Sequence, residues 1–533
     1  MGNSCTCFER GSWDGHPGVT ASYPEGSEVY QDMTQPLSHY FISSGHNSYL
    51  TGDQLFATAG TATILKSLRA GCRVIELDVY NGPICKHGGT FTSPVSFQKC
   101  IAAIGQAAFI TSHYPVIITM ENHTDVANQG KMAEILLKVL GERLFVPDPE
   151  DSRREFLSPA DLKDKIVCRT SIKHSGIYHP EFRKLIYIRN TKCSSLQGMI
   201  KREDVVSSSF EESAMPQSDD LGPDDSEAKM ERQKKKLLKK RRIWKEQLEK
   251  SPEDLGDEPE DAVLPGEGGM VAGSLQELYT YTSRHMARVY PALWRVTSGN
   301  YNPMRAWVRG ASLAALNWQV WDKALWCNEA KFMDNGRCGY VLKPQWMRSP
   351  EAKLPQGTSR KLVVRVHSAY KFQGRNCLLF KDDLFIKINI WGMPCDCSSQ
   401  KTRTAHDTGR LLVDKEFVFS LRFPEMAVLC LALKDDDSGG IGGAVRSAVA
   451  DSLGYFALPL SILKAGDYKL VLKDPVTGQP LDSQHNWMKV GLRWEDGARG
   501  EGDTDQQRDK ESVAVEAATN PMYAGRDPQG QNP

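Results

Sequence analysis

The chain has 533 residues, too many for one ordinary hydrophobic core, so two or three domains are expected. Lys plus Arg and Asp plus Glu number 66 each, and this balance excludes a global charge that would attract nucleic acid. No stretch holds the roughly eighteen uncharged apolar residues of a membrane span, and the N-terminus lacks the apolar core of a secretory signal. The thirteen cysteines show no framework spacing, and Cys72, Cys168 and Cys430 lie in apolar runs, which favours free thiols in a reducing compartment.

The first residues, "MGNSCTCF", fit the N-myristoylation pattern, with Gly2 as the acceptor and Thr6 at the hydroxyl position. One myristoyl chain binds membranes only reversibly, so palmitoylation of the adjacent Cys5 or Cys7 would supply the second anchor. The alternative is a disordered start with incidental cysteines. We expect attachment to the cytoplasmic face of a membrane, the plasma membrane above all, and a cytoplasmic protein otherwise.

From about residue 37 to 167, short apolar runs alternate with helix-like stretches. They read in order "HYFISS", "TATILKSLRAG", "CRVIELDVY", "VSFQKCIAAIGQAAF", "PVIITMENH" and "MAEILLKVLGERL". Strand–helix alternation of this kind predicts a parallel α/β sheet or barrel.

Two of these strands carry carboxylates. In "CRVIELDVY" the alternation of a strand places Glu76 and Asp78 on one side, and "PVIITMENH" delivers Glu121 at its C-terminal end. Asn47 follows the first strand, and barrel enzymes place their active sites at this end of the strands. Buried carboxylates need cations, and a site made only of oxygen ligands suits calcium or magnesium rather than zinc.

Two histidines accompany the carboxylates. His46 ends the "HYFISSGH" run, and His87 precedes two glycines that let backbone approach a ligand closely. Each histidine alone is more often structural. Beside three carboxylates at strand ends, the pair is typical of acid–base and charge-stabilising groups.

Residues 211–273 interrupt the alternation with acidic, Pro- and Gly-containing sequence around a basic block, and we interpret them as a disordered insertion. Strand-like patterning resumes at "ARVYP" and "SLAALNWQVW". From Lys361 onward the runs are purely strand-like and predict an all-β sandwich. The charged tail after Asp496 is predicted to be unstructured.

These motifs resemble a known family. "SHYFISSGHNSYLTGDQL", "GCRVIELDVYNGP", "HGGTFTSPVSF" and "YPVIITMENH" are similar to the X half of the catalytic barrel of eukaryotic phosphoinositide-specific phospholipase C. "SSSFEE", "RVYPALWRVTSGNYNPMRAW" and "NGRCGYVLKP" are similar to its Y half, and the likeness continues through a C2-like sandwich. The wording is nearest to plant and protist members. The resemblance implies an α/β TIM-type barrel, split into X and Y halves and followed by an all-β C2 sandwich.

The resemblance also implies an activity: calcium-dependent hydrolysis of phosphatidylinositol 4,5-bisphosphate, and of less phosphorylated inositides, to diacylglycerol and inositol phosphate. Calcium would be held by Asn47, Glu76, Asp78 and Glu121. The inositol 2-hydroxyl would attack its own phosphodiester, with Glu76 as general base, and form a cyclic phosphodiester. His46 would stabilise charge on the phosphate and His87 would protonate the leaving diacylglycerol oxygen.

Recognition of the inositol headgroup falls, by the same resemblance, to a second set of residues: Arg169, Lys173, Ser209, Arg288 and Tyr290. Tyr290 would lie against the ring face while the cations neutralise phosphates. The sequence departs from the animal pattern here, which usually has two lysines two positions apart. This chain has Arg169 and then Ser171, with Lys173 two further on.

The expected organisation differs from that of larger family members. Pleckstrin-type and EF-hand modules are not expected, because only about thirty residues precede the barrel. The charged insertion follows "SSSFEE", so it is expected inside the Y half. The predicted segments are a lipidated N-terminus (1–30), the X half (31–175), the start of the Y half (176–210), the insertion (211–273), the rest of the Y half (274–350), the C2 domain (358–495) and a disordered tail (496–533).

In the C2-like region, Asp383, Asp435 and Asp437 stand on two loops that could meet and bind calcium, although acidic surface turns are the simpler interpretation. Two other functions compete with this one for the whole chain. A scaffold that has lost activity would lack a histidine or a calcium ligand, and all are present. A metal-independent bacterial-type lyase would carry a basic side chain where this chain has its carboxylates.

The insertion carries its own hypothesis. Ten Lys or Arg stand between Lys229 and Lys245 with Glu231 as the one acidic residue, and acidic runs flank the block. A solvated charge run is the simpler interpretation. A helix here would nevertheless have an apolar side, formed by Leu237, Leu238, Ile243 and Trp244. Acidic flanks could then hold the active site off an anionic membrane until the basic helix binds that surface.

Overall fold

The computed structural model describes residues 11–13, 16–19, 28–150, 154–171, 178–214, 273–351, 353–355, 359–371, 382–406, 408–436 and 452–495. Several sequence predictions lie outside these residues: those on Gly2, Cys5, Cys7, Lys173 and Asp437, on nearly all of the 211–273 insertion, and on the 496–533 tail.

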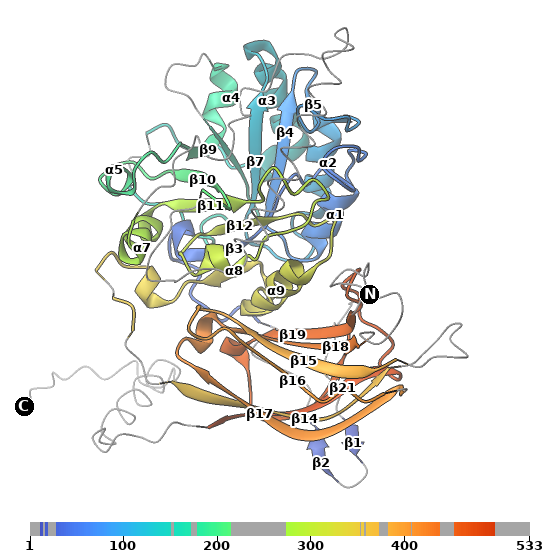
Figure 1. Cartoon of the computed structure of the whole chain (residues 1–533). Helices are drawn as coiled ribbons and strands as arrows, with labels where there is room; N and C mark the ends of the chain where they lie inside the picture. The colour runs from blue at the N-terminus through green and yellow to red at the C-terminus, as the bar shows by residue number, and fades with distance from the viewer. Residues whose placement is uncertain are drawn as a thin grey trace, which may run out of the picture.

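Eight parallel strands form a closed barrel in the first part of the chain (Figure 1). They are β3 (Tyr40–Gly45), β4 (Val74–Tyr80), β7 (Val116–His123), β8 (Ile166–Ser171), β9 (Ile186–Asn190), β10 (Ser207–Glu211), β11 (Met286–Tyr290) and β12 (Leu313–Leu316). Each strand pairs with the next in chain order, and β12 pairs with β3, which also contacts β4 and closes the ring. The predicted TIM-type barrel is confirmed.

Helices follow most of these strands and cover the barrel. They are α1 (Ala62–Arg69), α2 (Phe97–Ala107), α3 (Val126–Leu140), α4 (Pro180–Lys184), α5 (Leu196–Ile200), α7 (Leu275–Arg284), α8 (Met304–Trp307) and α9 (Lys323–Lys331). In α2, Phe97, Cys100, Ile101 and Ile104 recur at helical spacing and are buried against the sheet. Side-chain caps fix the starts of several helices, as where Ser274 forms a capping box for α7.

Short elements complete the barrel. Two small strands, β5 (Ile84–Cys85) and β6 (Val95–Ser96), extend the edge beside β4, and β13 (Tyr340–Leu342) pairs antiparallel with β3. The 3₁₀ turns are η2 (Leu37–His39), η3 (Gly141–Arg143), η6 (Asn335–Arg337) and η7 (Gln345–Met347). None of the described helices is both long enough and apolar enough to cross a bilayer.

The barrel interior changes character along its length. Inward-facing residues near the N-terminal ends of the strands, such as Ile42, Val74 and Ile117, form one apolar cluster. Outward-facing residues of the same strands, such as Ile75 and Leu77, pack instead under the helices. Further along β4 the inward positions become Glu76 and Asp78, as the alternation predicted. The inward-facing carboxylates of β4 therefore lie toward the C-terminal, or catalytic, end of the barrel.

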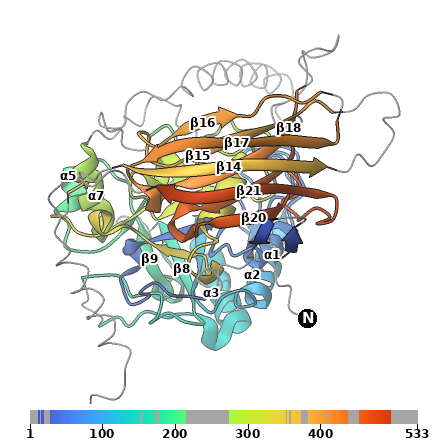
Figure 2. The same cartoon turned by 90° about the horizontal axis from the view of Figure 1, so that it is seen from below.

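The C-terminal part is an antiparallel sandwich of two four-stranded sheets. One has the order β17-β14-β21-β20 and the other β16-β15-β18-β19. The strands are β14 (Arg360–Lys371), β15 (Leu384–Trp391), β16 (Ser398–Lys401), β17 (Arg410–Leu421), β18 (Val428–Asp435), β19 (Ser452–Pro459), β20 (Gly466–Val471) and β21 (Asn486–Glu495), with 3₁₀ turns η8 (Pro424–Met426) and η9 (Leu460–Ile462). Figure 2 shows β14, β17, β21 and β20 on the side turned away from the barrel. The predicted all-β sandwich is confirmed.

The sandwich packs against the barrel through the sheet that contains β18 and β19 (Figure 1). The ring of Trp326 on α9 stacks on Tyr455 of β19 with centroids 4.1 Å apart, and Trp321 Nε1 donates to Tyr455 Oη over 2.9 Å. Lys473 forms an ion pair with Glu329 at the same interface. The contact is aromatic and largely buried, so the two domains form one continuous core.

Two described segments flank residues 215–272. β10 runs to Glu211, and the carboxylate of Glu212 binds Arg295 after the strand ends. The chain resumes at Gly273, just before α7. A helix that follows a parallel barrel strand starts at the C-terminal end of that strand, so both flanks lie at the catalytic end. Near the N-terminus, β1 (Gly11–Trp13) and β2 (His16–Val19) pair as a hairpin close to β20.

Candidate active site and metal centre

Three carboxylates meet at the catalytic end of neighbouring strands. Glu76 and Asp78 come from β4 and Glu121 from β7, where Asp78 and Glu121 stand directly opposite each other. One oxygen of each lies within 4.8 Å of the others. Glu76 and Asp78 are buried, whereas Glu121 is exposed. Among the described residues these three form the only group of three or more His, Cys, Asp or Glu side chains close enough together to hold a metal ion.

The carboxylate of Asp78 has one oxygen that no described group satisfies. Its Oδ2 accepts a hydrogen bond from the hydroxyl of Tyr49 at 2.7 Å, but its buried Oδ1 has no hydrogen-bond partner among the described residues. Burial, together with the carboxylates of Glu121 and Glu76, raises the pKa of Asp78 well above its usual range. A divalent cation would satisfy Oδ1 and offset this repulsion, so the donor set fits a hard metal ion such as calcium.

Asn47, the fourth predicted ligand, lies beside the cluster in a left-handed backbone conformation, with φ of 42°. Asparagine tolerates this conformation better than most residues. Its backbone N–H donates to Glu76 Oε2 at 3.0 Å, and its side-chain Nδ2 donates to Gln54 Oε1 at 2.9 Å. The side-chain nitrogen is thus engaged, which leaves the amide oxygen as the atom suited to a metal.

Glu76 also forms a buried ion pair with Arg288 of β11, on the other side of the barrel mouth, and each side chain is 1% exposed. Burial by itself would raise the pKa of Glu76. The Arg288 guanidinium and the Asn47 N–H outweigh it, so the pKa of Glu76 lies below its usual value and the group is ionised. Arg288 Cζ lies 5.1 Å from the centre of the Tyr290 ring, which places a cation and an aromatic face together at the site.

His46 lies next to Glu76, with 4.0 Å between its Nε2 and Glu76 Oε2. Its Nδ1 is 2.9 Å from Asn317 Oδ1, and its ring is parallel to that of Tyr290 with centroids 6.4 Å apart. Burial lowers the pKa of His46 to about 4, since the attraction of Glu76 compensates only in part. Without substrate this imidazole is therefore neutral at neutral pH.

His87 is fixed by one short hydrogen bond, from its Nδ1 to the backbone carbonyl of Gln54 at 2.6 Å. A carbonyl can only accept, so Nδ1 carries the proton and Nε2 is the nitrogen that remains for chemistry. Burial lowers the pKa of His87, and the Gln54 carbonyl and Glu76 oppose this shift. One residue, Gln54, thus positions both a predicted ligand and a predicted acid.

Arg169 of β8 is held by a set of small polar side chains. Its Nε and Nη2 donate to Ser207 Oγ at 3.0 and 2.9 Å, and Nη2 also donates to Asn190 Oδ1 at 2.7 Å and Ser209 Oγ at 2.8 Å. Burial, followed by the nearby Arg288 cation, lowers the pKa of Arg169 to about 9, which still leaves it charged. The bonds fix the plane of the guanidinium, as recognition of a planar or tetrahedral anion requires.

The structure thus brings together every barrel residue predicted for catalysis, metal binding and headgroup recognition except Lys173, which lies outside the described residues. Their individual roles stay predictions. Sequence reasoning missed Gln54, Asn190 and Asn317, each of which holds one of them. Asn317 follows directly after β12 and Asn190 ends β9, so the rule that polar residues gather after strand ends would have found both.

Comparisons with known proteins agree with this geometry. Residues 33–171 match the family model of the phosphatidylinositol-specific phospholipase C X domain, and residues 269–346 match that of the Y domain. The chain is 31% identical over 484 residues to "Phosphoinositide phospholipase C 6" of Arabidopsis thaliana, an alignment that covers 85% of this chain and 76% of that protein. The chain belongs to the phosphoinositide-specific phospholipase C family.

Two further proteins are similar to this chain over most of its length. The chain is 29% identical to human "Inactive phospholipase C-like protein 2", over 88% of this chain and 41% of that one, so relatives named inactive share the likeness. The crystal structure of PLC21 from S. officinalis superposes with a TM-score of 0.69 at 23% identity, covering 89% of this chain and 57% of that one, and it has the same fold. The predicted family and enzyme class, a phosphoinositide-specific phospholipase C, are confirmed.

The C2 domain of this phospholipase places two of its three predicted calcium ligands together. Asp383 N–H donates to Asp435 Oδ1 at 2.8 Å, and His406 Nδ1 lies 2.9 Å from Asp383 Oδ2. Asp437 lies outside the described residues. Calcium binding at this end of the sandwich stays a prediction.

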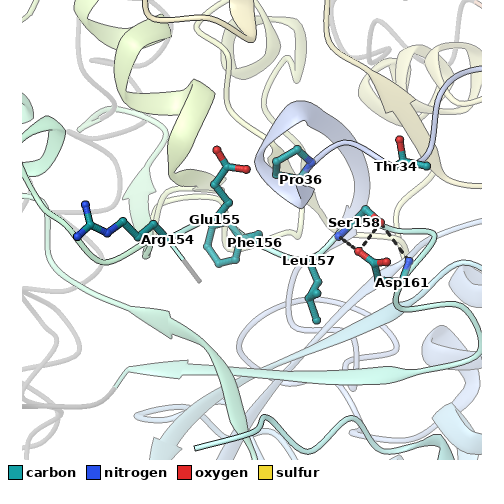
Figure 3. Close-up of a pocket in the computed structure, with 8 residues that line it drawn as sticks. All are labelled: Thr34, Pro36, Arg154, Glu155, Phe156, Leu157, Ser158 and Asp161. Carbon is teal, nitrogen blue, oxygen red and sulfur yellow. Dashed lines mark hydrogen bonds between the residues drawn. The ribbon is translucent and has the colours of Figure 1, made fainter. Parts of the chain in front are cut away.

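The phospholipase also has a pocket of about 440 Å³ far from this chemistry (Figure 3). Arg154, Phe156, Leu157 and Ser158 line it beside Pro36, next to the start of β3. Because β3 begins there, the pocket lies at the N-terminal end of the barrel, where barrel enzymes do not place their active sites. Ser158 and Asp161 bond to each other in it, as the dashed lines show.

Proposed function

We propose that this enzyme hydrolyses phosphatidylinositol 4,5-bisphosphate, and less phosphorylated inositides, to diacylglycerol and inositol phosphate in a calcium-dependent reaction of intracellular signalling. The observation that carries the proposal is the buried Asp78 oxygen without a partner, within a cluster of three carboxylates. Two histidines and two arginines surround that cluster. This arrangement supports binding of a phosphodiester and transfer of its protons.

Glu76 is the proposed base for the inositol 2-hydroxyl. A calcium ion held by Asn47, Glu76, Asp78 and Glu121 would supply positive charge that makes this hydroxyl more acidic. Glu76 is a weak base while it is paired with Arg288. A substrate phosphate that binds the Arg288 guanidinium would break this ion pair and make Glu76 more basic.

The histidines are proposed to act on the two sides of the phosphodiester. His46 is neutral without substrate, and an anionic phosphate beside it would raise its pKa so that it donates a hydrogen bond to the developing charge. An anionic phosphate beside His87 would likewise raise its pKa, so that Nε2 takes up a proton while Nδ1–H stays bonded to the Gln54 carbonyl. His87 would then pass the Nε2 proton to the diacylglycerol oxygen. The reaction would pass through a cyclic inositol phosphodiester, which water then hydrolyses.

Arg169, Ser209, Arg288 and Tyr290 are the proposed headgroup site, with Lys173 as a further cation. Two buried arginines support binding of a phosphorylated ring, since a guanidinium binds phosphate through two parallel hydrogen bonds. Ser171 stands where a second cation is usual in animal relatives, and its Oγ accepts from Asn190 Nδ2 at 2.9 Å. Because this chain has Ser171 instead of a second cation, we expect its rates of hydrolysis for bisphosphorylated and monophosphorylated substrate to differ less.

Exposed aromatic side chains beside the site support a substrate that stays in a bilayer. Phe56 and Phe91 are 68% and 61% exposed, and their rings stack with centroids 5.7 Å apart. Phe56 follows Gln54 closely and Phe91 lies in the loop that carries His87. Insertion of these rings among lipid tails would place the active site at headgroup depth.

Acylation of Gly2 with Cys5 or Cys7 is the proposed anchor to the cytoplasmic face of the plasma membrane. We expect Gly2→Ala, or replacement of Cys5 and Cys7 together, to shift the protein from the membrane to the soluble fraction, because one acyl chain binds weakly. Retention of both variants on membranes would place the anchor elsewhere in the chain.

The insertion is proposed to act as a brake. Its two described flanks lie at the catalytic end, so acidic runs beside them would face the same anionic lipid as the active site. Deletion of residues 215–268 is expected to raise basal hydrolysis on anionic vesicles and to weaken its dependence on salt. Unchanged activity with unchanged salt dependence would make the segment a passive linker.

The decisive experiment measures hydrolysis of vesicle-borne phosphatidylinositol and its mono- and bisphosphates across free calcium concentrations. We expect product release that requires calcium and is fastest with the bisphosphate. A variant in which Asn190 is replaced by alanine is a useful companion, since it loosens Arg169 without touching the carboxylates. Tight vesicle binding without hydrolysis of any inositide would instead assign the chain to the inactive relatives.

A further inference from the structure

A series of buried, uncharged side chains lies beside the two histidines of the active site. Its members are Gln54, Ser298 and Asn317, which are 7%, 0% and 1% exposed. Gln54 Nε2 donates to Ser298 Oγ at 2.7 Å and to Asn317 Oδ1 at 3.3 Å. We call these three residues the amide network. They join the X half of the barrel, which supplies Gln54, to the Y half, which supplies the other two.

The direction of each hydrogen bond in the amide network follows from one acceptor at its end. The backbone carbonyl of Gly52 can only accept, so the Ser298 hydroxyl gives its proton to that oxygen, at 2.8 Å. Ser298 Oγ then accepts from Gln54, which turns the amide nitrogen of Gln54 toward it. The same nitrogen faces Asn317, so the Asn317 atom next to it is the oxygen. The orientation of both amides is thus fixed by their partners.

Asn317 Oδ1 is also the partner of His46. It lies 2.9 Å from His46 Nδ1, and an amide oxygen can only accept, so Nδ1 carries the ring proton. The backbone N–H of His46 donates to the Leu316 carbonyl at 2.8 Å. The backbone N–H of Asn317 donates to Asn300 Oδ1 at 2.6 Å. β12 and β3 run side by side with Leu316 opposite Gly45, so the residues that follow the two strands meet (Figure 1).

The other end of the Asn317 amide is unsatisfied. Its Nδ2 is buried and has no hydrogen-bond partner among the described residues. A buried N–H group without an acceptor lowers the stability of a fold. The asparagine at this position is therefore explained by the bond that Oδ1 makes with His46 rather than by a gain in stability.

Without Asn317, the ring proton of His46 would have a better position than Nδ1. His46 Nε2 lies 4.0 Å from Glu76 Oε2, so a small tilt of the ring would let an Nε2–H group donate to this carboxylate. The proposed base and the proposed charge-stabilising group would then bond to each other. While Asn317 holds the proton on Nδ1, Nε2 of the neutral ring cannot donate to Glu76, and both groups stay available to substrate.

We propose that Asn317 is a positioning residue that acts through His46. By accepting the Nδ1 proton, it selects one tautomer and one orientation of the ring, with Nε2 toward the metal centre. The backbone carbonyl of Gln54 accepts from Nδ1 of His87 at 2.6 Å, so the amide network gives both histidines the same tautomer. The effect on turnover rests on the proposed function, whereas the tautomer of His46 does not depend on it.

The test compares the full chain with three variants. Asn317→Ala removes the acceptor, and Asn317→Asp restores an acceptor of the same shape. Asn328→Ala is the matched control, because Asn328 is also 1% exposed with one unpartnered atom, but its Nδ2 faces Ser43 rather than a histidine. NMR of protein with isotope-labelled histidine reads the tautomer of the neutral His46 ring, and its signal is assigned by its loss in His46→Ala. Thermal melting confirms that each variant folds.

The wild type and Asn328→Ala should carry the His46 proton on Nδ1, whereas Asn317→Ala should carry it mainly on Nε2. Turnover is measured with a short-chain, monomeric inositide. Asn317→Ala should lower kcat on the order of a hundredfold with KM within about twofold, because a misplaced group weakens the transition state more than substrate binding. Asn317→Asp should keep the Nδ1 proton and recover kcat to within about tenfold, since it restores the acceptor but adds a charge.

Several results would overturn the inference. They are a proton that stays on Nδ1 in Asn317→Ala, a proton that leaves Nδ1 in folded Asn317→Asp, and a moved proton with unchanged kcat. An equal fall of kcat in Asn328→Ala would also overturn it, by showing that loss of any buried amide has this effect. If the wild type hydrolyses no inositide while Asn317→Ala still moves the proton to Nε2, the proposed function fails and the control of the His46 tautomer by Asn317 stands.

Discussion

Replacement of Asp78 by asparagine tests the metal centre with little change of shape. The amide oxygen of asparagine can accept the hydrogen bond from Tyr49 that Asp78 Oδ2 accepts at 2.7 Å. The substitution removes one negative charge from the three-carboxylate cluster and puts an N–H group where Oδ1 has no partner. The fold should survive, and a cation should lose a ligand.

The magnitude follows from the cluster's dimensions. At an effective dielectric constant of about 20, two carboxylates 4.8 Å apart repel each other by about 3.5 kcal/mol. The raised pKa of Asp78 already relieves part of this repulsion by protonation. Without calcium, Asp78→Asn should therefore be as stable as the wild type or slightly more stable. With free calcium at about a hundred times its Kd, the wild type gains about 2.7 kcal/mol and the variant gains nothing.

The assay is thermal unfolding with a calcium chelator and then with added calcium. The wild type should melt about 3 °C higher with calcium, and Asp78→Asn should melt at the same temperature with and without calcium. Glu134→Gln, at an exposed position on α3, is the control and should keep the calcium shift. A calcium shift of wild-type size in Asp78→Asn would show that the cluster does not bind the ion, and the proposed mechanism would fall.

Three other outcomes can be measured directly. His87→Ala should lower the turnover rate by about a hundredfold or more while folding and vesicle binding stay intact, because His87 acts on the leaving group; activity within a few fold of wild type would make it structural. Tyr455→Phe leaves Trp321 Nε1 without its acceptor at the domain interface and should lower the free energy of unfolding, measured with urea, by about 1–3 kcal/mol. An unchanged free energy of unfolding would show that water replaces the hydroxyl. Burial, followed by the Arg284 and Arg202 cations, lowers the pKa of His285 to about 4, so the unfolded chain binds more protons and the free energy of unfolding falls as pH drops from about 6.5 toward 4. His285→Gln should therefore reduce the loss of melting temperature between pH 7 and pH 5. An unchanged loss would exclude His285 as its source.

The sequence by itself determined the features that depend on local periodicity. Strand alternation put Glu76 and Asp78 on the inward side of β4, and the end of an apolar strand placed Glu121 beside them. These inferences succeeded because side chains alternate strictly along a strand and parallel strands deliver their C-terminal ends to one place. The order of barrel and sandwich followed in the same way from the change of period along the chain.

Only the tertiary structure decided which groups touch across the barrel mouth. Arg288 pairs with Glu76 although 212 positions separate them, and Asn317 contacts His46 across 271 positions. Such contacts depend on barrel closure and on the register of β12 with β3, which no local pattern encodes. The seating of the sandwich on the barrel is likewise set by the contacts of Tyr455 with Trp321 and Trp326, because packing between domains fixes their relative direction.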